Sequence, residues 1–386
     1  MNRNKKVLIC GYYGYHNLGD EAMLSGILTL LKKVQPDLVP TVLSSNPSNT
    51  KTIHSIKAIK QGGNFLDKLR RLFHYVMSDY FILGGGDLLR DTAKSSIANS
   101  WLSSVQKAIK FKCCTIVLGV SVGEIFKDET KKLIPEVLNQ VDYIGVRDFQ
   151  SKLKLENLGV VQKIHIVKDL ALENSAKYNL NFDYSHEEKK PINVGMAVRK
   201  LSNRGPSVNP QTYSNVAIEI AAFIDLLVEK HDVKIHMLPF QASQVSSRLD
   251  SDDYACSLEI VNLSNCPDRF VVHRCFESVE EYIEMSRELD VVVGMRLHSL
   301  ILAAGIGIPA IGIEYDPKVR YFMNEVNQLE NMVPLNCLDR HCLLAMAEKI
   351  LQDLPNAQEK LTSGLITYRK STDESIKTFK ELLSCN

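Results

Sequence analysis

The stretch of sequence that decides the fold runs from residue 290 to residue 318 and reads DVVVGMRLHSLILAAGIGIPAIGIEYDPK. It opens with a β-branched run from Val291 to Val293 and continues with a compact apolar segment from Leu297 to Ala304. A second apolar run follows, from Pro309 to Ile313. This order predicts a strand, a tight turn, a helix and a second strand. Such a βαβ unit is typical of a parallel sheet in an α/β fold.

Charged side chains in this stretch fall where its strands end. Arg296 and His298 lie between the first strand and the helix, while Glu314, Asp316 and Lys318 follow the second strand. Ligands of open α/β sheets bind at this carboxyl edge. An Arg and a His in an apolar turn suit an anion or a proton transfer. The alternative is structural, with Arg296 capping backbone carbonyls and His298 paired inside a packed turn.

The composition excludes several classes of protein. A chain of 386 residues is long enough for two or three domains. With 46 Lys and Arg against 45 Asp and Glu, it lacks the basic excess of a nucleic-acid-binding protein, so no nucleic acid partner is expected. Nine cysteines, an odd number without a Cys-x-x-Cys pair, indicate neither a disulfide framework nor a zinc site. We therefore expect no metal.

Hydrophobic segments for targeting are also missing from the sequence. Only four apolar residues, from Val7 to Cys10, precede the first glycine, fewer than the about 7 of a signal peptide. No apolar stretch approaches the about 18 residues of a membrane span. The expected location is the cytoplasm.

The first glycine-rich turn has the sequence GYYGYHNLGDEA at residues 11–22. It follows a strand that ends at Cys10, and a helix is predicted to begin near Asp20. The glycine spacing fits neither the dinucleotide fingerprint nor a P-loop. Asp20 and Glu21 either stabilise the helix N-terminus or, with Asn17, bind the hydroxyls of a sugar. We carry both interpretations forward.

A second glycine-rich turn, LGGGD at residues 83–87, follows a strand predicted from Tyr80 to Leu83. Three consecutive glycines let the backbone approach a ligand closely. Gly85, Gly86 and Asp87 are therefore candidates for contacts with a ligand.

Arg147 repeats the pattern of Arg296, because it also follows a predicted parallel strand, from Val141 to Val146. It is a candidate ligand for an anion. The structural alternative is that Arg147 pairs with Asp148 or with a helix end.

The polar segment at residues 178–191 has the composition of a linker. We predict two Rossmann-like, doubly wound α/β domains, 1–180 and 190–386, that face a cleft in a GT-B-like arrangement, with the last helix able to cross back. Arg147 would reach the cleft from one half, and Arg296, His298 and Lys318 from the other.

Further strands are predicted near 53–59 and at 114–120, 141–146, 164–172, 192–198, 233–239 and 270–273. Helices are predicted at 65–76, 128–138, 149–158, 211–230, 279–289, 338–354 and 358–383, and residues 241–269 are expected to be mostly loop with one short helix.

Taken together, the motifs resemble the polysaccharide pyruvyl transferase family. The matching segments are GYHNLGDEA at 14–22, LGGGD at 83–87, VRD at 146–148, GMRLHS at 294–299 and EYDPK at 314–318. The sequence looks closest to the branch that adds a pyruvate ketal to N-acetylmannosamine in the secondary cell wall polymer that anchors surface-layer proteins. The resemblance implies phosphoenolpyruvate as donor, a lipid-diphosphate-linked saccharide as acceptor, no cofactor, and peripheral contact with the inner face of the membrane.

The resemblance also assigns roles to residues of this chain. Donor binding falls to Arg147, Arg296, Leu297, His298 and Lys318, with Arg147, Arg296 and His298 as the catalytic group. Acceptor binding falls to Asn17, Asp20, Glu21, Gly85, Gly86 and Asp87. His298 would deliver a proton to the enol carbon of the donor, because histidine titrates near neutral pH. The arginines would stabilise the carboxylate and the departing phosphate. Relatives are expected to carry Arg where this chain has Lys318, and Lys lacks the bidentate contact.

Two other functions fit parts of the same sequence. A nucleotide-sugar-dependent GT-B glycosyltransferase would share the architecture, and Glu314 would then bind a ribose. A binding protein for sugar polymers would need exposed aromatic side chains, and the chain has a single Trp, Trp101. Release of phosphate from phosphoenolpyruvate separates these alternatives.

Overall fold

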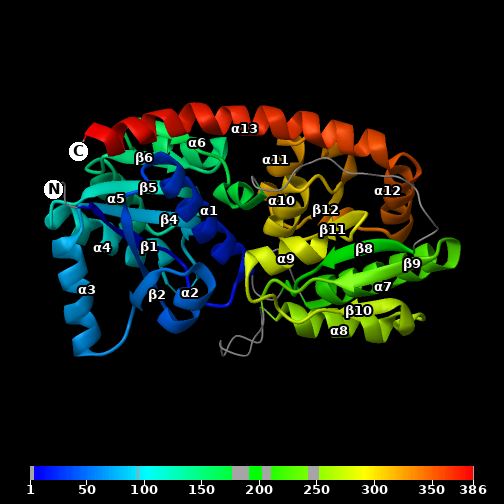
Figure 1. Cartoon of the computed structure of the whole chain (residues 1–386). Helices are drawn as coiled ribbons and strands as arrows, with labels where there is room; N and C mark the ends of the chain where they lie inside the picture. The colour runs from blue at the N-terminus through cyan, green and yellow to red at the C-terminus, as the bar shows by residue number, and fades with distance from the viewer. Residues whose placement is uncertain (1–3, 94, 176–190, 202–209, 242–251, 386) are drawn as a thin grey trace. The chain divides into compact units, whose positions relative to one another are not determined.

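The computed structural model describes residues 4–93, 95–175, 191–201, 210–241 and 252–385. The chain divides into two compact units (Figure 1). Unit 1 comprises Met1–Tyr15, Asp20–Glu173 and Arg369–Asn386, and unit 2 comprises His16–Gly19 and Asn174–Tyr368. The predicted boundary near residues 180–190 lies in the segment 176–190, outside the described residues.

Unit 1 contains a parallel sheet of seven strands in the order β3-β2-β1-β4-β5-β6-β7. Its chain order reverses between β1 and β4, which makes this the switch point where ligands of doubly wound sheets bind. The strands are β1 (Lys6–Cys10), β2 (Val39–Ser44), β3 (Lys57–Lys60), β4 (Tyr80–Leu89), β5 (Cys114–Val122), β6 (Tyr143–Val146) and β7 (Ile164–Ile166). The helices are α1 (Leu18–Val34), α2 (Pro47–His54), α3 (Phe65–Met77), α4 (Ile97–Lys110), α5 (Asp128–Leu138) and α6 (Phe149–Asn157).

Unit 2 contains a parallel sheet of six strands in the order β10-β9-β8-β11-β12-β13, with its switch point between β8 and β11. The strands are β8 (Ile192–Ala197), β9 (Val233–Met237), β10 (Phe270–Val272), β11 (Val291–Gly294), β12 (Ala310–Glu314) and β13 (Met332–Pro334). The helices are α7 (Pro210–Lys230), α8 (Asp253–Leu263), α9 (Val279–Ser286), α10 (Leu297–Gly305), α11 (Pro317–Glu325) and α12 (Arg340–Gln352). The βαβ prediction for residues 290–318 is confirmed.

Both sheets are buried on their two faces, which explains the continuous apolar runs in the sequence. Val291, Val292 and Val293 are fully buried in unit 2, and Phe81 and Ile82 are fully buried in unit 1. Because the strand interiors are apolar, the polar side chains of each sheet gather at the strand ends. The two-domain α/β prediction is confirmed.

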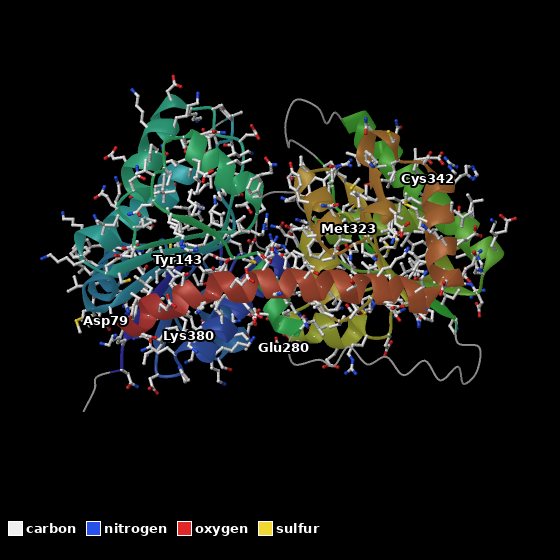
Figure 2. All side chains as sticks on the ribbon, turned by 90° about the horizontal axis from the view of Figure 1, so that it is seen from above. Asp79, Tyr143, Glu280, Met323, Cys342 and Lys380 are labelled. Atoms are coloured by element: carbon white, nitrogen blue, oxygen red, sulfur yellow. The ribbon has the colours of Figure 1, made fainter. Side chains whose placement is uncertain are left out.

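The long helix α13 (Leu354–Cys385) contributes to both units. Its first part packs tightly in unit 2, where a β-carbon at Gly364 would lie 2.4 Å from the Val326 backbone. In unit 1 the Tyr143 hydroxyl donates to the Ser375 carbonyl (3.2 Å), and Figure 2 labels Tyr143 together with Lys380 of α13, both in this unit.

Strand β4 corrects the prediction of a turn after Leu83. The strand continues through the three glycines to Leu89, with a change of register against β5 between Gly86 and Leu89. Gly85 (φ 75°) and Gly86 (φ 88°) adopt backbone conformations that side chains disfavour. The glycines therefore lie inside the strand, and the bulge follows them, between Gly86 and Leu89.

Other element predictions need correction as well. The strand expected at 164–172 ends at Ile166, because a 3-10 helix forms at Leu170–Ser175. Strands β2 and β13 and helices α2, α4 and α11 were not predicted. The short helix expected in the segment 241–269 is α8, while residues 242–251 lie outside the described part of the chain, as do 178–190 of the predicted linker.

Candidate active site

Helix α10 begins directly at the switch point of unit 2. Arg296 is its N-cap residue, and the Arg296 side chain makes no capping hydrogen bond to the helix. Leu297 and His298 form the first turn. Unsatisfied backbone N–H groups and the helix dipole make such an N-terminus favourable for an anion. Three of the donor-binding candidates predicted from the sequence therefore lie at a helix end that suits a negative charge.

Arg296 is held by a carboxylate that the sequence analysis missed. Its Nε and Nη2 donate to the two oxygens of Asp253 at 2.8 and 2.6 Å, and Nη2 also reaches Gln241 Oε1 at 3.4 Å. Asp253 is fully buried and also accepts from the backbone N–H groups of Phe240 and Gln241. A bidentate pair fixes the guanidinium plane. A ligand carboxylate that used the same edge of Arg296 would have to displace Asp253.

His298 lies against the segment His16–Gly19, which belongs to unit 2 although it lies early in the chain. Asn17 pairs with Gln241 in an antiparallel bridge, and the Leu18 N–H donates to the Phe240 carbonyl (2.9 Å). A β-carbon at Gly19 would lie 2.2 Å from His298 Nδ1. Only glycine leaves room for the imidazole at this position.

Two further cations of unit 2 meet at Tyr315. The guanidinium of Arg199 lies 5.2 Å from the ring centroid, and its Nη1 donates to the tyrosine hydroxyl (3.3 Å). Lys318 Nζ lies 5.8 Å from the same centroid and 3.3 Å from Asp316 Oδ2. Arg199 follows β8, the strand beside β11, and is buried. The rule that selected Arg147 and Arg296, an Arg at the end of a parallel strand, would also have found it.

Glu314 and Asp316 have structural roles in this arrangement. Glu314 accepts two hydrogen bonds from Arg320, at 2.9 and 2.5 Å. Asp316 caps α11 by accepting from the Lys318 N–H (3.1 Å). The ribose contact considered for Glu314 would compete with the Arg320 pair.

The glycine-rich segments of unit 1 pack together at its switch point. The Tyr13 hydroxyl donates to the Gly84 carbonyl, and burial raises the pKa of Tyr13 well above its usual range, so the phenol remains a donor. A β-carbon at Gly86 would lie 2.9 Å from Asp20 Oδ1. Asp20, Gly85 and Gly86, three predicted acceptor residues, therefore lie together.

Glu21 is more deeply buried than a carboxylate that binds an acceptor sugar would need to be. Its Oε1 accepts from the Gly14 N–H (2.8 Å), and its Oε2 lies 2.7 Å from His54 Nε2. Both side chains are buried. The contacts favour the structural interpretation of Glu21, since a sugar hydroxyl would have to replace one of these partners.

Arg147 is buried in unit 1 with two carboxylates. Its Nη1 donates to Asp169 Oδ2 (3.1 Å), and its Nε lies 3.9 Å from Asp148 Oδ2. The pairing with Asp148 was the structural alternative in the sequence analysis, whereas the pairing with Asp169 was not foreseen. Donor binding by Arg147 stays a prediction.

The remaining acceptor candidates are divided between the units. Asp87 lies 3.6 Å from Arg90 in unit 1. Asn17 belongs to unit 2, where its Oδ1 accepts from the Gly19 N–H (3.1 Å). Among the described residues, no group of three His, Cys, Asp or Glu side chains is arranged to hold a metal ion.

Comparisons with known proteins bear on these residues. The sequence model of the family described as "Polysaccharide pyruvyl transferase" matches residues 17–317. This range includes the α10 N-terminus, the glycine-rich segment 83–87 and the last part of the segment 11–22. The amylovoran biosynthesis protein AmsJ of Erwinia amylovora is 20% identical over 93% of this chain and 95% of its own length.

Solved structures share the fold at low sequence identity. A glycosyltransferase from Rickettsia africae matches with a TM-score of 0.60 at 13% identity, covering 99% of both chains. The UDP complex of S. aureus MnaA matches with a TM-score of 0.62 at 9% identity, covering 98% of this chain and 97% of its own. These likenesses identify the fold as GT-B-like and do not extend to activity.

Proposed function

The chain belongs to the polysaccharide pyruvyl transferase family, and on this premise we propose that it transfers pyruvate from phosphoenolpyruvate to a sugar as a ketal and releases phosphate. The proposed acceptor is N-acetylmannosamine in a lipid-diphosphate-linked precursor of a cell wall polymer. A likeness to a protein of amylovoran biosynthesis is compatible with polysaccharide synthesis and leaves the sugar open.

One observation carries this proposal, namely the N-terminus of α10 with Arg296 and His298 on either side of Leu297. Phosphoenolpyruvate is small and strongly anionic. A helix N-terminus is a favourable place for such an anion, and Arg296 adds a positive charge whose orientation Asp253 fixes. Arg199 and Lys318, which meet at Tyr315, provide further positive charge at the same edge of the sheet.

The reaction requires one proton transfer to carbon and stabilisation of two anionic groups. A proton from His298 goes to C3 of the enol, which makes C2 electrophilic. One sugar hydroxyl attacks C2, the C2–O bond to phosphate breaks, and a second hydroxyl closes the ketal ring. Of the two hydroxyl protons, one leaves with the phosphate as hydrogen phosphate and the other restores protonated His298. General acid catalysis of this kind contributes roughly 10²- to 10⁴-fold in rate.

The acceptor side of the proposal uses unit 1. Asp20 and Asp87 are carboxylates that accept hydrogen bonds from sugar hydroxyls. Gly85 and Gly86 are buried against the side chains of Met23 and Asp20, so the sugar would meet this segment through the partly exposed Asp20 and Asp87, and direct contacts with the two glycines stay a prediction. The family prediction that Arg147 contacts the donor is retained for testing.

The proposal is tested with purified protein, phosphoenolpyruvate and a lipid-linked N-acetylmannosamine disaccharide. We expect release of inorganic phosphate only when donor and acceptor are both present, together with a product whose mass and NMR spectrum show a cyclic pyruvate ketal. A parallel reaction replaces phosphoenolpyruvate with UDP-sugars. Turnover of a UDP-sugar without phosphate release from phosphoenolpyruvate would establish the glycosyltransferase alternative instead. Failure with this acceptor and success with another saccharide would correct only the sugar.

A further inference from the structure

Helix α3 of unit 1 presents its apolar side to solvent, the reverse of an ordinary surface helix. It carries six exposed apolar side chains, with Phe65 70% and Phe73 58% exposed; the set is Phe65, Leu66, Leu69, Leu72, Phe73 and Val76. With 3.6 residues per turn, these positions form one continuous stripe along the helix. We call this stripe the α3 face.

The inner side of α3 is polar and accounts for how the helix is attached. Tyr75 is buried, and Arg71 donates to the Gly62 carbonyl (2.9 Å). Asn64 and Asp67 form a reciprocal capping box at the N-terminus. These contacts fix the helix on β1 and β3, and Figure 1 shows it at the outer side of unit 1. The outward direction of the α3 face is therefore set by the fold.

Basic residues border the α3 face on both sides. By helical spacing, Lys68 and Arg70 lie at its two margins, and both are exposed. From Lys57 to Met77 the chain has five basic residues and one acidic residue, whereas the whole chain has a net charge of only +1. The single acid, Asp67, is engaged in the capping box.

A hollow beside α3 has both basic and apolar side chains in its lining. It is lined by Lys57, Ile59, Arg70, Phe73 and His74. Burial first, and then the charges of Lys57 and Lys6, lower the pKa of His74, so positive charge lies close to this hollow. Such a site suits a phosphate group at the boundary of an apolar phase.

We propose that the α3 face docks the protein onto the surface of an anionic phospholipid membrane, with the helix in the plane of the interface. An amphipathic helix with aromatic and leucine side chains on one side and Lys or Arg at the margins is the form that binds such surfaces. A second copy of the chain is disfavoured as the occupant, since a symmetric contact would bring the basic margins together. With 13 residues, α3 spans about 20 Å and cannot cross a membrane.

No helix in the described part of the chain, α3 included, is long and apolar enough to traverse a bilayer. Peripheral docking would bring a lipid-linked acceptor to the protein, but the docking does not depend on the proposed activity. It is tested with protein and vesicles alone.

The main experiment is flotation of the full chain with vesicles of phosphatidylcholine and phosphatidylglycerol in equal parts, compared with phosphatidylcholine alone. We expect binding to the anionic vesicles that weakens as salt is raised. Leu69→Ser with Phe73→Ser should lower partitioning about ten-fold or more, because two apolar anchors are lost. Lys68→Gln with Arg70→Gln should lower binding to anionic vesicles roughly ten-fold.

The matched control is Val161→Ser with Ile366→Ser, which removes two exposed apolar side chains outside the α3 face and should leave partitioning unchanged. Circular dichroism of each variant confirms that it is folded. A Phe73→Trp variant adds a direct probe, whose emission should shift to the blue on anionic vesicles, whereas the emission of the native Trp101, which is buried, should not.

Several results would overturn the proposal. These are absence of flotation with anionic vesicles, equal flotation with both lipids, or flotation that the α3 variants leave unchanged. If light scattering showed a dimer that Leu69→Ser with Phe73→Ser converts to a monomer, and no vesicles were bound, the α3 face would be an interface between copies of the chain.

Discussion

At the switch point of unit 1 the chain places glycines around a buried tyrosine, whereas at the switch point of unit 2 it places an arginine and a histidine at a helix N-terminus. The unit 1 edge has buried glycines and partly exposed carboxylates, with Asp20 close to Gly86. The unit 2 edge has cations, with Arg296 fixed by Asp253. The first arrangement suits a neutral ligand rich in hydroxyls, and the second suits a small anion.

The two arginines of the predicted site sharpen the comparison, because both are buried next to a carboxylate. Arg296 makes a bidentate pair with Asp253, whereas Arg147 makes one hydrogen bond to Asp169 and a longer contact with Asp148. A buried pair is weak evidence for a contribution to stability, but removal of one partner leaves a costly buried charge. Stability and activity therefore have to be measured separately for each arginine.

The largest expected effect is on catalysis in unit 2. His298→Gln should retain binding of phosphoenolpyruvate and lose about 10²- to 10⁴-fold in rate, because glutamine keeps a polar side chain but cannot deliver the proton. The measurement combines calorimetry with single-turnover rates at saturating donor. Weakened binding with a normal rate would assign His298 to anion binding alone.

A second prediction concerns Arg147 and the stability of unit 1. Arg147→Ala should lower the free energy of unfolding by about 3–5 kcal/mol, since the buried Asp169 loses its partner. Adding Asp169→Asn should restore most of that stability, because the uncompensated charge is removed. The free energies come from urea denaturation.

The same double variant decides the role of Arg147. If Arg147 binds the donor, Arg147→Ala with Asp169→Asn will be stable and inactive. Activity recovered together with stability would make Arg147 a structural residue.

A third and smaller effect, on the reaction rate, is expected from the contact between the segment His16–Gly19 and His298. Gly19→Ala should lower the rate about 10²-fold, because the added methyl group must displace the imidazole or the segment. Gly62→Ala is the matched control, since a β-carbon there meets no atom within 4 Å. The two variants are compared by steady-state kinetics. Equal rates would mean that the position of His298 tolerates a shift.

The smallest expected effect is a pH dependence of stability in unit 2. His236 Nδ1 lies 3.0 Å from His273 Nε2, and burial, followed by the charges of His273 and Lys234, lowers the pKa of His236 to about 4. In the unfolded chain His236 binds a proton near pH 6.5, whereas in the folded chain it binds one only near pH 4. The contribution of neutral His236 to the free energy of unfolding is therefore fully present above pH 6.5 and is lost as the pH falls toward 4. The loss should be on the order of 1–3 kcal/mol.

Urea denaturation at several pH values, compared with His236→Gln, measures this contribution. The variant should show a flatter pH dependence over the same window. Identical profiles for the two proteins would exclude His236 as the source.

Much of the fold was predictable because buried parallel strands have a distinct sequence signature. Val291 to Val293 and the run ending at Ile313 were identified from apolar, β-branched residues alone. The bulge in β4 was not predicted, because three glycines are equally typical of a turn, and the pairing with β5 decides between them. Strand β2 begins with the exposed Val39 and the partly buried Pro40, which weakened its signature.

The sequence by itself determined where the buried strands lie, and therefore that Arg147, Arg296 and His298 are found at strand ends. Only the tertiary structure decided their partners. Asp253 reaches Arg296 across 43 positions, and Gly19 reaches His298 across an even longer separation, through the docking of His16–Gly19 in unit 2. The outward direction of the α3 face was decided in the same way. Periodicity shows that a helix has an apolar side, but contacts distant in sequence determine whether that side faces the core or the solvent.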